Sequence, residues 1–500
     1  MIAAPATATA EPAPRRLGQR ALSLGAANAF DFALQFLLPV VLVRYLDAEA
    51  FGQYRLLWLA AGTVMAVVTQ SMSGSLYYFL PRSDARLKRL YINQALLFLC
   101  AAGMLGAWAV SAWNPWLPER MRDLALHDSV VPAFVMLWVV ASMLDLIAAA
   151  EERVAWQAKA TISLSALRAA GLSLAAILTG ELEPVLLALL GFVAIKVLLL
   201  LGYVARYHGL RGPLARRRAF AEQLRQSAPF GFAAALYGLR MQADQWVAAA
   251  LFPVGMFAAF SIGAVLSPLV QVCRLSVLQA LLPSVSRREA QGDMAGMVEL
   301  NARGSVMVAA IVFPLLAFAF VFAEEIVTIV YTGTYVAAAA VMRIYIAGLA
   351  ALVIEPATLM LLLRQGAFAI RVSVIALVLS IAVSWSAARG FGLAGAAAGS
   401  VAAIYADHAV TLWRISRRAG IPVRRLQDWR TLGLLLASAA AAGLLAWAVA
   451  GRIPAGSAVA RVAAGGALLG AGYAALALIS GAAQRWFAAI NGPQQAGRAG

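Results

Sequence analysis

Charged residues are scarce in this chain. Of its 500 residues only 13% are Asp, Glu, Lys or Arg, whereas 63% are hydrophobic and the mean hydropathy is +0.81. An ordinary soluble protein is about 25% charged. So few charges cannot cover the surface of a soluble globule of 52.6 kDa. The composition therefore excludes a soluble enzyme, a disordered chain and a disulfide-rich secreted domain, and it predicts a polytopic membrane protein.

Cysteine and histidine, two common metal ligands, are also rare. Cys100 and Cys273 lie in apolar runs and the three histidines are scattered, which predicts neither a disulfide nor a metal site. The sequence has no P-loop motif for nucleotide binding and no loop long enough to fold as a catalytic domain. We therefore expect no enzymatic activity, no catalytic residues and no bound cofactor, and we expect function to lie among the helices.

Apolar runs of helical length follow one another along nearly the whole chain. Each is close to the ~20 residues that a helix needs to cross about 30 Å of hydrocarbon. They predict an all-α polytopic membrane protein with about 14 transmembrane helices. The expected spans are 18–43, 53–80, 91–113, 130–150, 158–179, 184–204, 228–252, 255–282, 304–323, 338–362, 368–388, 391–413, 431–450 and 457–480.

Lysine and arginine are distributed unevenly between the two sides that these spans define. With the N-terminus inside, 28 of the 40 basic residues fall on inside segments and 7 on outside segments. Because cytoplasmic loops carry the excess of positive charge, we predict a multi-pass protein of the bacterial inner membrane with both termini in the cytoplasm. The same distribution explains the net charge of +17 without nucleic acid as a partner. Contact with anionic membrane lipids is its expected consequence.

The longest loop is basic and divides the spans into two sets. A tight turn that ends in aromatic residues recurs weakly on either side of it, at 46–54 and 251–260, which predicts two parallel lobes. The predicted organisation is a disordered cytoplasmic tail (1–17), an N-lobe of spans 1 to 6 (18–206), a basic cytoplasmic linker (207–227), a C-lobe of spans 7 to 12 (228–416), a peripheral C-terminal helix pair (417–480) and a cytoplasmic tail (481–500).

Ionisable residues inside membrane spans are costly and are functional candidates by default. The strongest is Arg274, which has no acidic residue one helical turn away and whose guanidinium suits an anionic, phosphorylated ligand. We predict that it binds substrate together with Arg240, Arg168, Lys196 and Gln271.

A structural explanation competes for several of these cations. Arg240 lies four residues before Asp244, so the two side chains could neutralise each other on one helix. Arg168 and Lys196 could instead pair with Asp145 or with lipid headgroups.

Two carboxylates, Asp31 and Asp244, are the candidates for coupling to a proton or a sodium ion. Asn28, Asp31 and Gln35 share one face of the first span, and such a polar stripe is expected where a helix lines a water-filled cavity. A hydrogen bond between packed helices is the competing explanation for Asp31.

Four stretches carry a resemblance to a known family. They are RYLDAEAFGQY (44–54), SGSLYYFLPR (73–82), FAEEIVTIVYTGTYVAAAAVMRIYIAGL (322–349) and RGFGLAGAAAGSVAAIYA (389–406). In order and spacing they resemble the bacterial polysaccharide flippases of the multidrug/oligosaccharidyl-lipid/polysaccharide exporter superfamily, and more distantly the lipid II flippases.

The resemblance implies two six-helix lobes around a central cavity, with two extra C-terminal helices. It also implies a substrate, a polyprenyl-pyrophosphate-linked oligosaccharide, which would cross the inner membrane by alternating access for export as a lipopolysaccharide or exopolysaccharide. A polysaccharide polymerase would be a partner. The alternative function is an ion-coupled multidrug or toxin antiporter of the same superfamily, although guanidinium groups suit organic cations poorly.

Overall fold

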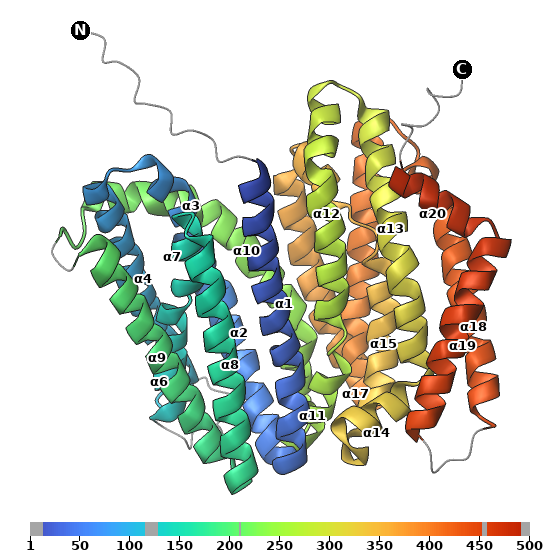
Figure 1. Ribbon diagram of the computed structural model, residues 1–500, viewed down its shortest axis with the longest axis horizontal. Coiled ribbons are helices and arrows are strands. Elements are labelled where there is room, and N and C mark those ends of the chain that lie inside the picture. The colour runs from blue at the N-terminus through green and yellow to red at the C-terminus, as the bar shows by residue number, and fades with distance from the viewer. Residues whose placement is uncertain (1–13, 116–128, 210–211, 453–457, 492–500) are drawn as a thin grey trace. The chain divides into compact units, whose positions relative to one another are not determined.

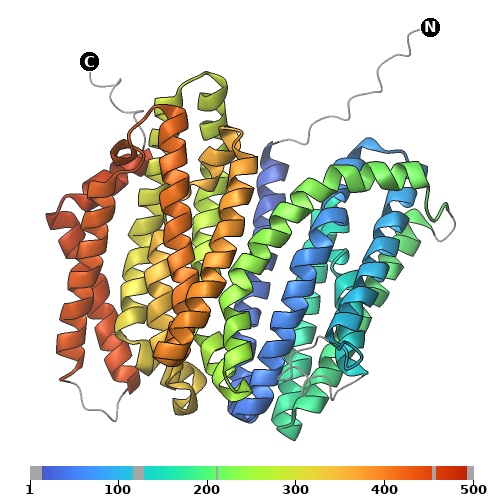
Figure 2. The same ribbon diagram turned by 180° about the vertical axis from the view of Figure 1, so that it is seen from behind.

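The computed structural model describes residues 14–115, 129–209, 212–452 and 458–491, and within them every regular element is a helix (Figures 1 and 2). The predicted all-α class is therefore confirmed. Of the predicted tails, residues 1–13 and 492–500 lie outside the described part of the chain. The remainder of both tails is helical, because α1 (Pro14–Tyr45) begins inside the first tail and α20 (Ala482–Asn491) lies in the second.

The described residues contain eleven helical stretches that are long and apolar enough to cross a membrane, and two of them, Val130–Ala150 and Val254–Ala290, each join two consecutive helices. One of them, α17 (Gly366–Ala419), contains two helices joined at Gly392 and corresponds to two predicted spans. α10 (Arg217–Leu251) is too polar to be counted among the eleven, and α15 (Ala338–Ala351) with α16 (Ala357–Leu362) is broken in the middle. These exceptions account for the difference from the predicted fourteen.

The helices pack into two compact units. The first contains the described residues up to Leu46 together with Val64–Phe232. Within it α1 packs on α8, α8 on α9, and α4 and α9 on α6. Its helices are α1, α3 (Leu76–Phe79), η1 (Leu80–Arg82), α4 (Ala85–Val110), α6 (Val130–Ala141), α7 (Leu144–Ala150), α8 (Val154–Thr179) and α9 (Leu182–His208).

The second unit contains Asp47–Thr63 and the chain from Ala233 onward. Within it α13 packs against α12, α15, α18 and α20, and α15 packs against α11 and α17. Its further helices are α11 (Val254–Gly263), α12 (Ser267–Ala290), α13 (Met294–Val321), α14 (Ala323–Tyr331), η2 (Gly333–Tyr335), η3 (Val423–Arg425), α18 (Trp429–Ala450) and α19 (Ala458–Ile479). α2 (Ala48–Met72) and α10 contribute residues to both units.

Gly392 turns α17 back on itself. Its φ of 63° and ψ of −144° are accessible to glycine but strained for other residues. The two halves then meet through small side chains, with the Ser384 hydroxyl donating to the Ala396 carbonyl at 2.6 Å. Small residues allow such close approach of membrane helices.

The two turns of the weak sequence repeat lie against each other in the second unit. An ideal Cβ on Gly52 would lie 2.3 Å from the carbonyl oxygen of Val254, and one on Gly255 would lie 3.6 Å from the Ala48 Cβ. The start of α2 therefore packs on the start of α11 so closely that position 52 requires glycine.

Candidate functional site

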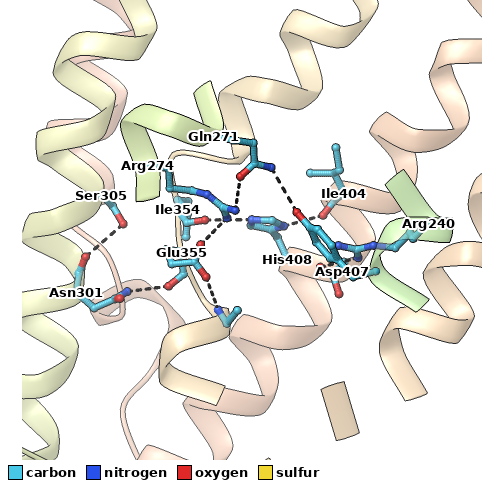
Figure 3. A network of polar contacts seen from close by, with 12 residues as sticks. Arg240, Gln271, Arg274, Asn301, Ser305, Ile354, Glu355, Ile404, Asp407 and His408 are labelled. Carbon is cyan, nitrogen blue, oxygen red and sulfur yellow. Dashed lines mark hydrogen bonds and ion pairs between the residues drawn. The ribbon is translucent and has the colours of Figure 1, made fainter. Parts of the chain in front are cut away.

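The predicted cation Arg274 lies at the centre of a polar network in the second unit (Figure 3). α12 places Gln271 and Arg274 one helical turn apart, and Arg274 Nη2 donates to Gln271 Oε1 at 2.6 Å. Arg274 Nη1 forms an ion pair with Glu355 in the break between α15 and α16. Both side chains are mostly buried, with 19% and 12% exposed.

Glu355 is held in place by the backbone around it. Its Oε1 accepts the N–H of Ala357 at 3.0 Å, and its carbonyl oxygen accepts the Asn301 side-chain amide at 3.2 Å. A carboxylate with these partners has a fixed position from which to meet the guanidinium. The break in the helix therefore positions the counter-ion of Arg274.

A small cavity lies beside this ion pair. It has a volume of about 20 Å³, and its polar lining comes from Arg274, Asn301, Ser305 and Glu355, with apolar side chains of α12 and α13 around them. That volume is enough for about one water molecule. A phosphate group is larger than a water molecule, so this cavity does not hold one in the present arrangement.

The intrahelical pair between Arg240 and Asp244, which was the structural alternative for these residues, is not formed. Arg240 Nη1 instead lies 3.0 Å from Asp407 Oδ2 on α17, and its guanidinium is 5.6 Å from the ring centroid of Tyr237. The Tyr237 hydroxyl is also 3.4 Å from Gln271 Nε2, so it connects the Arg240 and Arg274 pairs.

Asp244 has different partners from Arg240, although both lie on α10. The Asp244 side chain is buried, and its Oδ2 accepts the Tyr345 hydroxyl at 2.6 Å while its Oδ1 accepts the backbone N–H of Gln245 at 2.8 Å. No ion pair to Asp244 occurs in the described part of the chain. Asp244 is therefore a buried carboxyl with hydrogen-bond donors and no cationic partner.

Next to Asp407, His408 is buried between two backbone carbonyls. Its Nδ1 lies 2.9 Å from the Ile404 oxygen and its Nε2 lies 3.2 Å from the Ile354 oxygen. The second contact joins α17 to the segment that carries Glu355 (Figure 3). His408 thus connects the backbone next to Asp407 with the backbone next to Glu355.

In the first unit Asp31 and Arg168 come together. Asp31 Oδ1 accepts the Ser165 hydroxyl at 2.5 Å and lies 3.1 Å from Arg168 Nη2, while Gln35 donates to Asp31 Oδ2 at 2.6 Å. The partner of Arg168 is therefore Asp31, and α1 and α8 are joined by this contact.

Lys196 pairs with Asp145, which was one of the structural alternatives. Its Nζ lies 2.8 Å from Asp145 Oδ2 and 5.0 Å from the ring centroid of Trp138. The Lys196 side chain is 8% exposed and that of Asp145 is 56% exposed. The pair therefore connects a buried cation on α9 to the surface of the first unit.

All four predicted cations thus have carboxylate partners, and only the pair of Lys196 with Asp145 was among the alternatives drawn from the sequence. Asp31 was a predicted site residue but not the expected partner of Arg168, and two of the partners were not predicted as site residues at all. Glu355 and Asp407 lie near the ends of their predicted spans, where a charged side chain can reach the membrane surface. The sequence did contain one indication of them, because each cation that is buried inside a span requires a buried anion as its partner. Among the residues that the structure describes, no group of three His, Cys, Asp or Glu side chains is placed to hold a metal ion.

A family model described as "Lipid II flippase MurJ" matches residues 160–459 of the chain. None of the curated proteins searched matches it.

Three solved structures of similar fold have low sequence identity to this chain. A lipid II flippase MurJ in an inward closed conformation has a TM-score of 0.67 and 12% identity, over 91% of this chain and 98% of that one. A mutant of the Vibrio cholerae MATE transporter VcmN has a TM-score of 0.55 and 13% identity, over 81% and 96%. A transporter of the MOP superfamily from Pyrococcus furiosus has a TM-score of 0.53 and 13% identity, over 80% and 96%. These similarities establish the fold.

Proposed function

Since the chain belongs to the lipid II flippase MurJ family, we propose that it carries a polyprenyl-pyrophosphate-linked glycan across the bacterial inner membrane, with lipid II as the first candidate substrate. The chain is a multi-pass membrane transporter that moves a lipid-linked precursor, and it is not an enzyme. The family match over residues 160–459 is the observation that carries the proposal.

The superfamily predicted from the sequence motifs is confirmed, but the family is that of the lipid II flippases and not that of the polysaccharide flippases. The motif around Gly52 shows why the motifs could not separate the two. Gly52 packs on the Val254 backbone, so this motif reports helix packing and carries no information about the substrate.

The chemistry of the second unit suits a pyrophosphate. Arg274 and Arg240 are each neutralised by one carboxylate, so the unloaded protein contains no costly unpaired charge at these positions. The pyrophosphate brings about two negative charges and matches guanidinium groups bidentately. It would replace Glu355 or Asp407 as the counter-ion, and Gln271 would add an uncharged hydrogen bond.

Arg168 and Lys196 are assigned the same role in the first unit, with Asp31 and Asp145 as the carboxylates to be displaced. The headgroup itself cannot cross hydrocarbon without such compensation, because its desolvation is too costly. The polyprenyl chain would remain in lipid while the protein alternates its access between the two sides.

Coupling to an ion gradient belongs to the same proposal. Asp244 suits the task better than Asp31, because Asp31 already has a cationic partner whereas Asp244 has hydrogen-bond donors only. A buried carboxyl without a cation can take up a proton at low cost. We assign Asp244 the coupling role, with a proton or a sodium ion as the coupling species and Asp31 as the second candidate.

A precursor of an exported polysaccharide is the second candidate substrate, because its polyprenyl pyrophosphate would meet the same guanidinium groups. A polymerase that extends the exported glycan would then be a partner. An antiporter for organic cations is disfavoured, because such a cargo cannot replace a carboxylate beside Arg274.

Depletion of the protein in its own host tests these alternatives. For lipid II transport, we expect lipid II to accumulate in the inner leaflet and the cells to lyse. Loss of a surface polymer in cells that keep an intact wall would assign the second substrate. Normal lipid II, normal polymer and increased drug sensitivity would contradict the proposal and identify an antiporter.

A further inference from the structure

Arg89 is a buried cation without a counter-ion. It lies in the second turn of α4 and is 8% exposed. Its Nε and Nη1 are both buried and find no hydrogen-bond acceptor, and none of the ion pairs in the described residues includes it. A buried charge with no partner is destabilising, so an anion bound at this guanidinium would stabilise it.

Residues 212–216, which precede α10, lie against Arg89 and the next turn of α4. An ideal Cβ on Gly212 would lie 2.9 Å from the Arg89 Cγ, so only a small residue fits over this side chain. One helical turn further along α4, the Asn93 amide donates to the Pro213 carbonyl at 2.9 Å, and the Arg216 N–H donates to Gln94 Oε1 at 3.1 Å. These contacts fix residues 212–216 along the same part of α4.

A second link fixes the start of α10 in the same place. Gln94 Nε2 donates to Gln223 Oε1 at 3.2 Å, and Gln223 Nε2 donates to the Ser75 hydroxyl at 2.7 Å. Figure 2 shows the first turns of α10 crossing the end of the unit at which α4 begins. The arginines that open α10 are therefore held at the same end of the first unit as Arg89.

The surroundings of Arg89 are strongly basic. Residues 80–90 and 212–226 contain eight basic side chains and two acidic ones. One of the two acids, Asp84, caps α4 by accepting the N–H of Leu87 at 2.7 Å. The positive charge at this end of the first unit is consequently not balanced by the protein itself.

The position of Arg89 identifies the source of the anion. α4 is an apolar span, so its beginning lies at the level of the lipid headgroups, and Leu97 and Leu105 further along it are exposed where acyl chains would run. Anionic lipid attracts basic segments at this depth. We propose that Arg89, with the arginines at the start of α10, binds the phosphodiester headgroup of an anionic phospholipid, at a site separate from the Arg274 network.

Native mass spectrometry of the purified full chain tests the proposal. Phosphatidylglycerol and phosphatidylcholine are titrated separately, and inorganic phosphate and pyrophosphate are tested as competitors. We expect phosphatidylglycerol to bind, phosphatidylcholine to bind at least tenfold more weakly, and Arg89→Gln to weaken phosphatidylglycerol binding roughly tenfold or more. Arg89→Lys keeps the charge and should weaken it less.

Arg424→Gln is the matched control, because Arg424 is an exposed arginine of η3 in the second unit. It removes one positive charge and should leave the affinity of the Arg89 site unchanged. Equal binding of phosphatidylglycerol by wild type and Arg89→Gln would overturn the proposal. Displacement of the lipid by phosphate or pyrophosphate at similar concentrations would assign the site to a soluble anion and overturn it as well.

A second variant covers the case in which Arg89→Gln does not fold. Two of the three exposed arginines at residues 216–218 are replaced together, in Arg216→Gln/Arg217→Gln. We expect a loss of affinity of about tenfold. Unchanged affinity in this variant would refute the site by itself.

Discussion

Removal of one member of the Arg274–Glu355 pair should have unequal effects. In Glu355→Gln, a guanidinium that is 19% exposed loses its anion. Breaking a buried pair in this way costs about 3–5 kcal/mol, and the partial exposure favours the lower end of that range. In Arg274→Gln, the remaining carboxyl can take up a proton and keeps the N–H of Ala357, so the expected cost is only about 1–2 kcal/mol.

The double variant Arg274→Gln/Glu355→Gln carries no charge at this place. It should therefore be more stable than Glu355→Gln alone, with a coupling energy of about 1–3 kcal/mol. The assay is thermal unfolding of the purified proteins at one scan rate, since membrane proteins of this size often unfold irreversibly.

The exposed pair Glu299–Arg303 on α13 provides the control cycle. Its side chains are 60% and 26% exposed, so its coupling energy should stay below about 1 kcal/mol. A double variant at 274 and 355 that is no more stable than Glu355→Gln would refute the view that Glu355 neutralises Arg274. In transport, Arg274→Gln should reduce flipping roughly tenfold or more, because a charge-assisted contact to phosphate is lost.

Three further substitutions test other parts of the structure. Asp244→Asn should retain the melting temperature but reduce transport in proteoliposomes about tenfold. The transport that remains should not depend on the proton gradient. Transport that still depends on the gradient in this variant would remove Asp244 from coupling. Gly52→Ala should destabilise by about 1–3 kcal/mol, because its Cβ would lie 2.3 Å from the Val254 oxygen, and an unchanged melting temperature would contradict this packing. Glu151→Gln should destabilise the folded protein at neutral pH by about 1–3 kcal/mol. Below pH 4.5, the melting temperature of this variant should depend less on pH than that of wild type.

The sign of the Glu151 effect follows from its surroundings. Burial raises the pKa of this carboxyl, but hydrogen bonds from His208 and Tyr203 and the nearby Arg153 outweigh burial and hold the pKa below its ordinary value of 4.5. A group with a lowered pKa stabilises the folded state above its ordinary pKa, and this stabilisation disappears as the pH falls through the folded value. Wild type should therefore lose stability in that acidic range, and Glu151→Gln should not.

The sequence predicted the helices well because apolar runs of about 20 residues have few alternatives in a membrane. It did not predict the places where a helix breaks inside a predicted span. The predicted span 255–282 is two helices, α11 and α12, with a turn at 264–266, and the predicted span 130–150 is α6 and α7. Such breaks depend on packing between distant segments, which periodicity does not contain.

The sequence named the cations of the polar network but not their carboxylate partners. Arg274 and Gln271 share a helical face, so their contact follows from spacing. Glu355 lies 81 residues further along the chain than Arg274, and its position depends on the break between α15 and α16. For Arg240, helical spacing offered Asp244 as a partner, whereas the structure pairs it with Asp407 on α17. Spacing along one helix contains no information about a carboxylate on another helix.

The carboxylate partners also bear on selectivity. An incoming ligand gains affinity at Arg274 only if it compensates the guanidinium better than Glu355 does, and a pyrophosphate, with more charge and more acceptor oxygens than one carboxylate, meets that condition. The displaced Glu355 then has no cation and is stabilised by taking up a proton. In the proposed function, binding of the lipid-linked substrate would therefore favour proton uptake at the same place. A neutral or cationic ligand cannot produce this exchange, which explains why the pairs favour a pyrophosphate cargo.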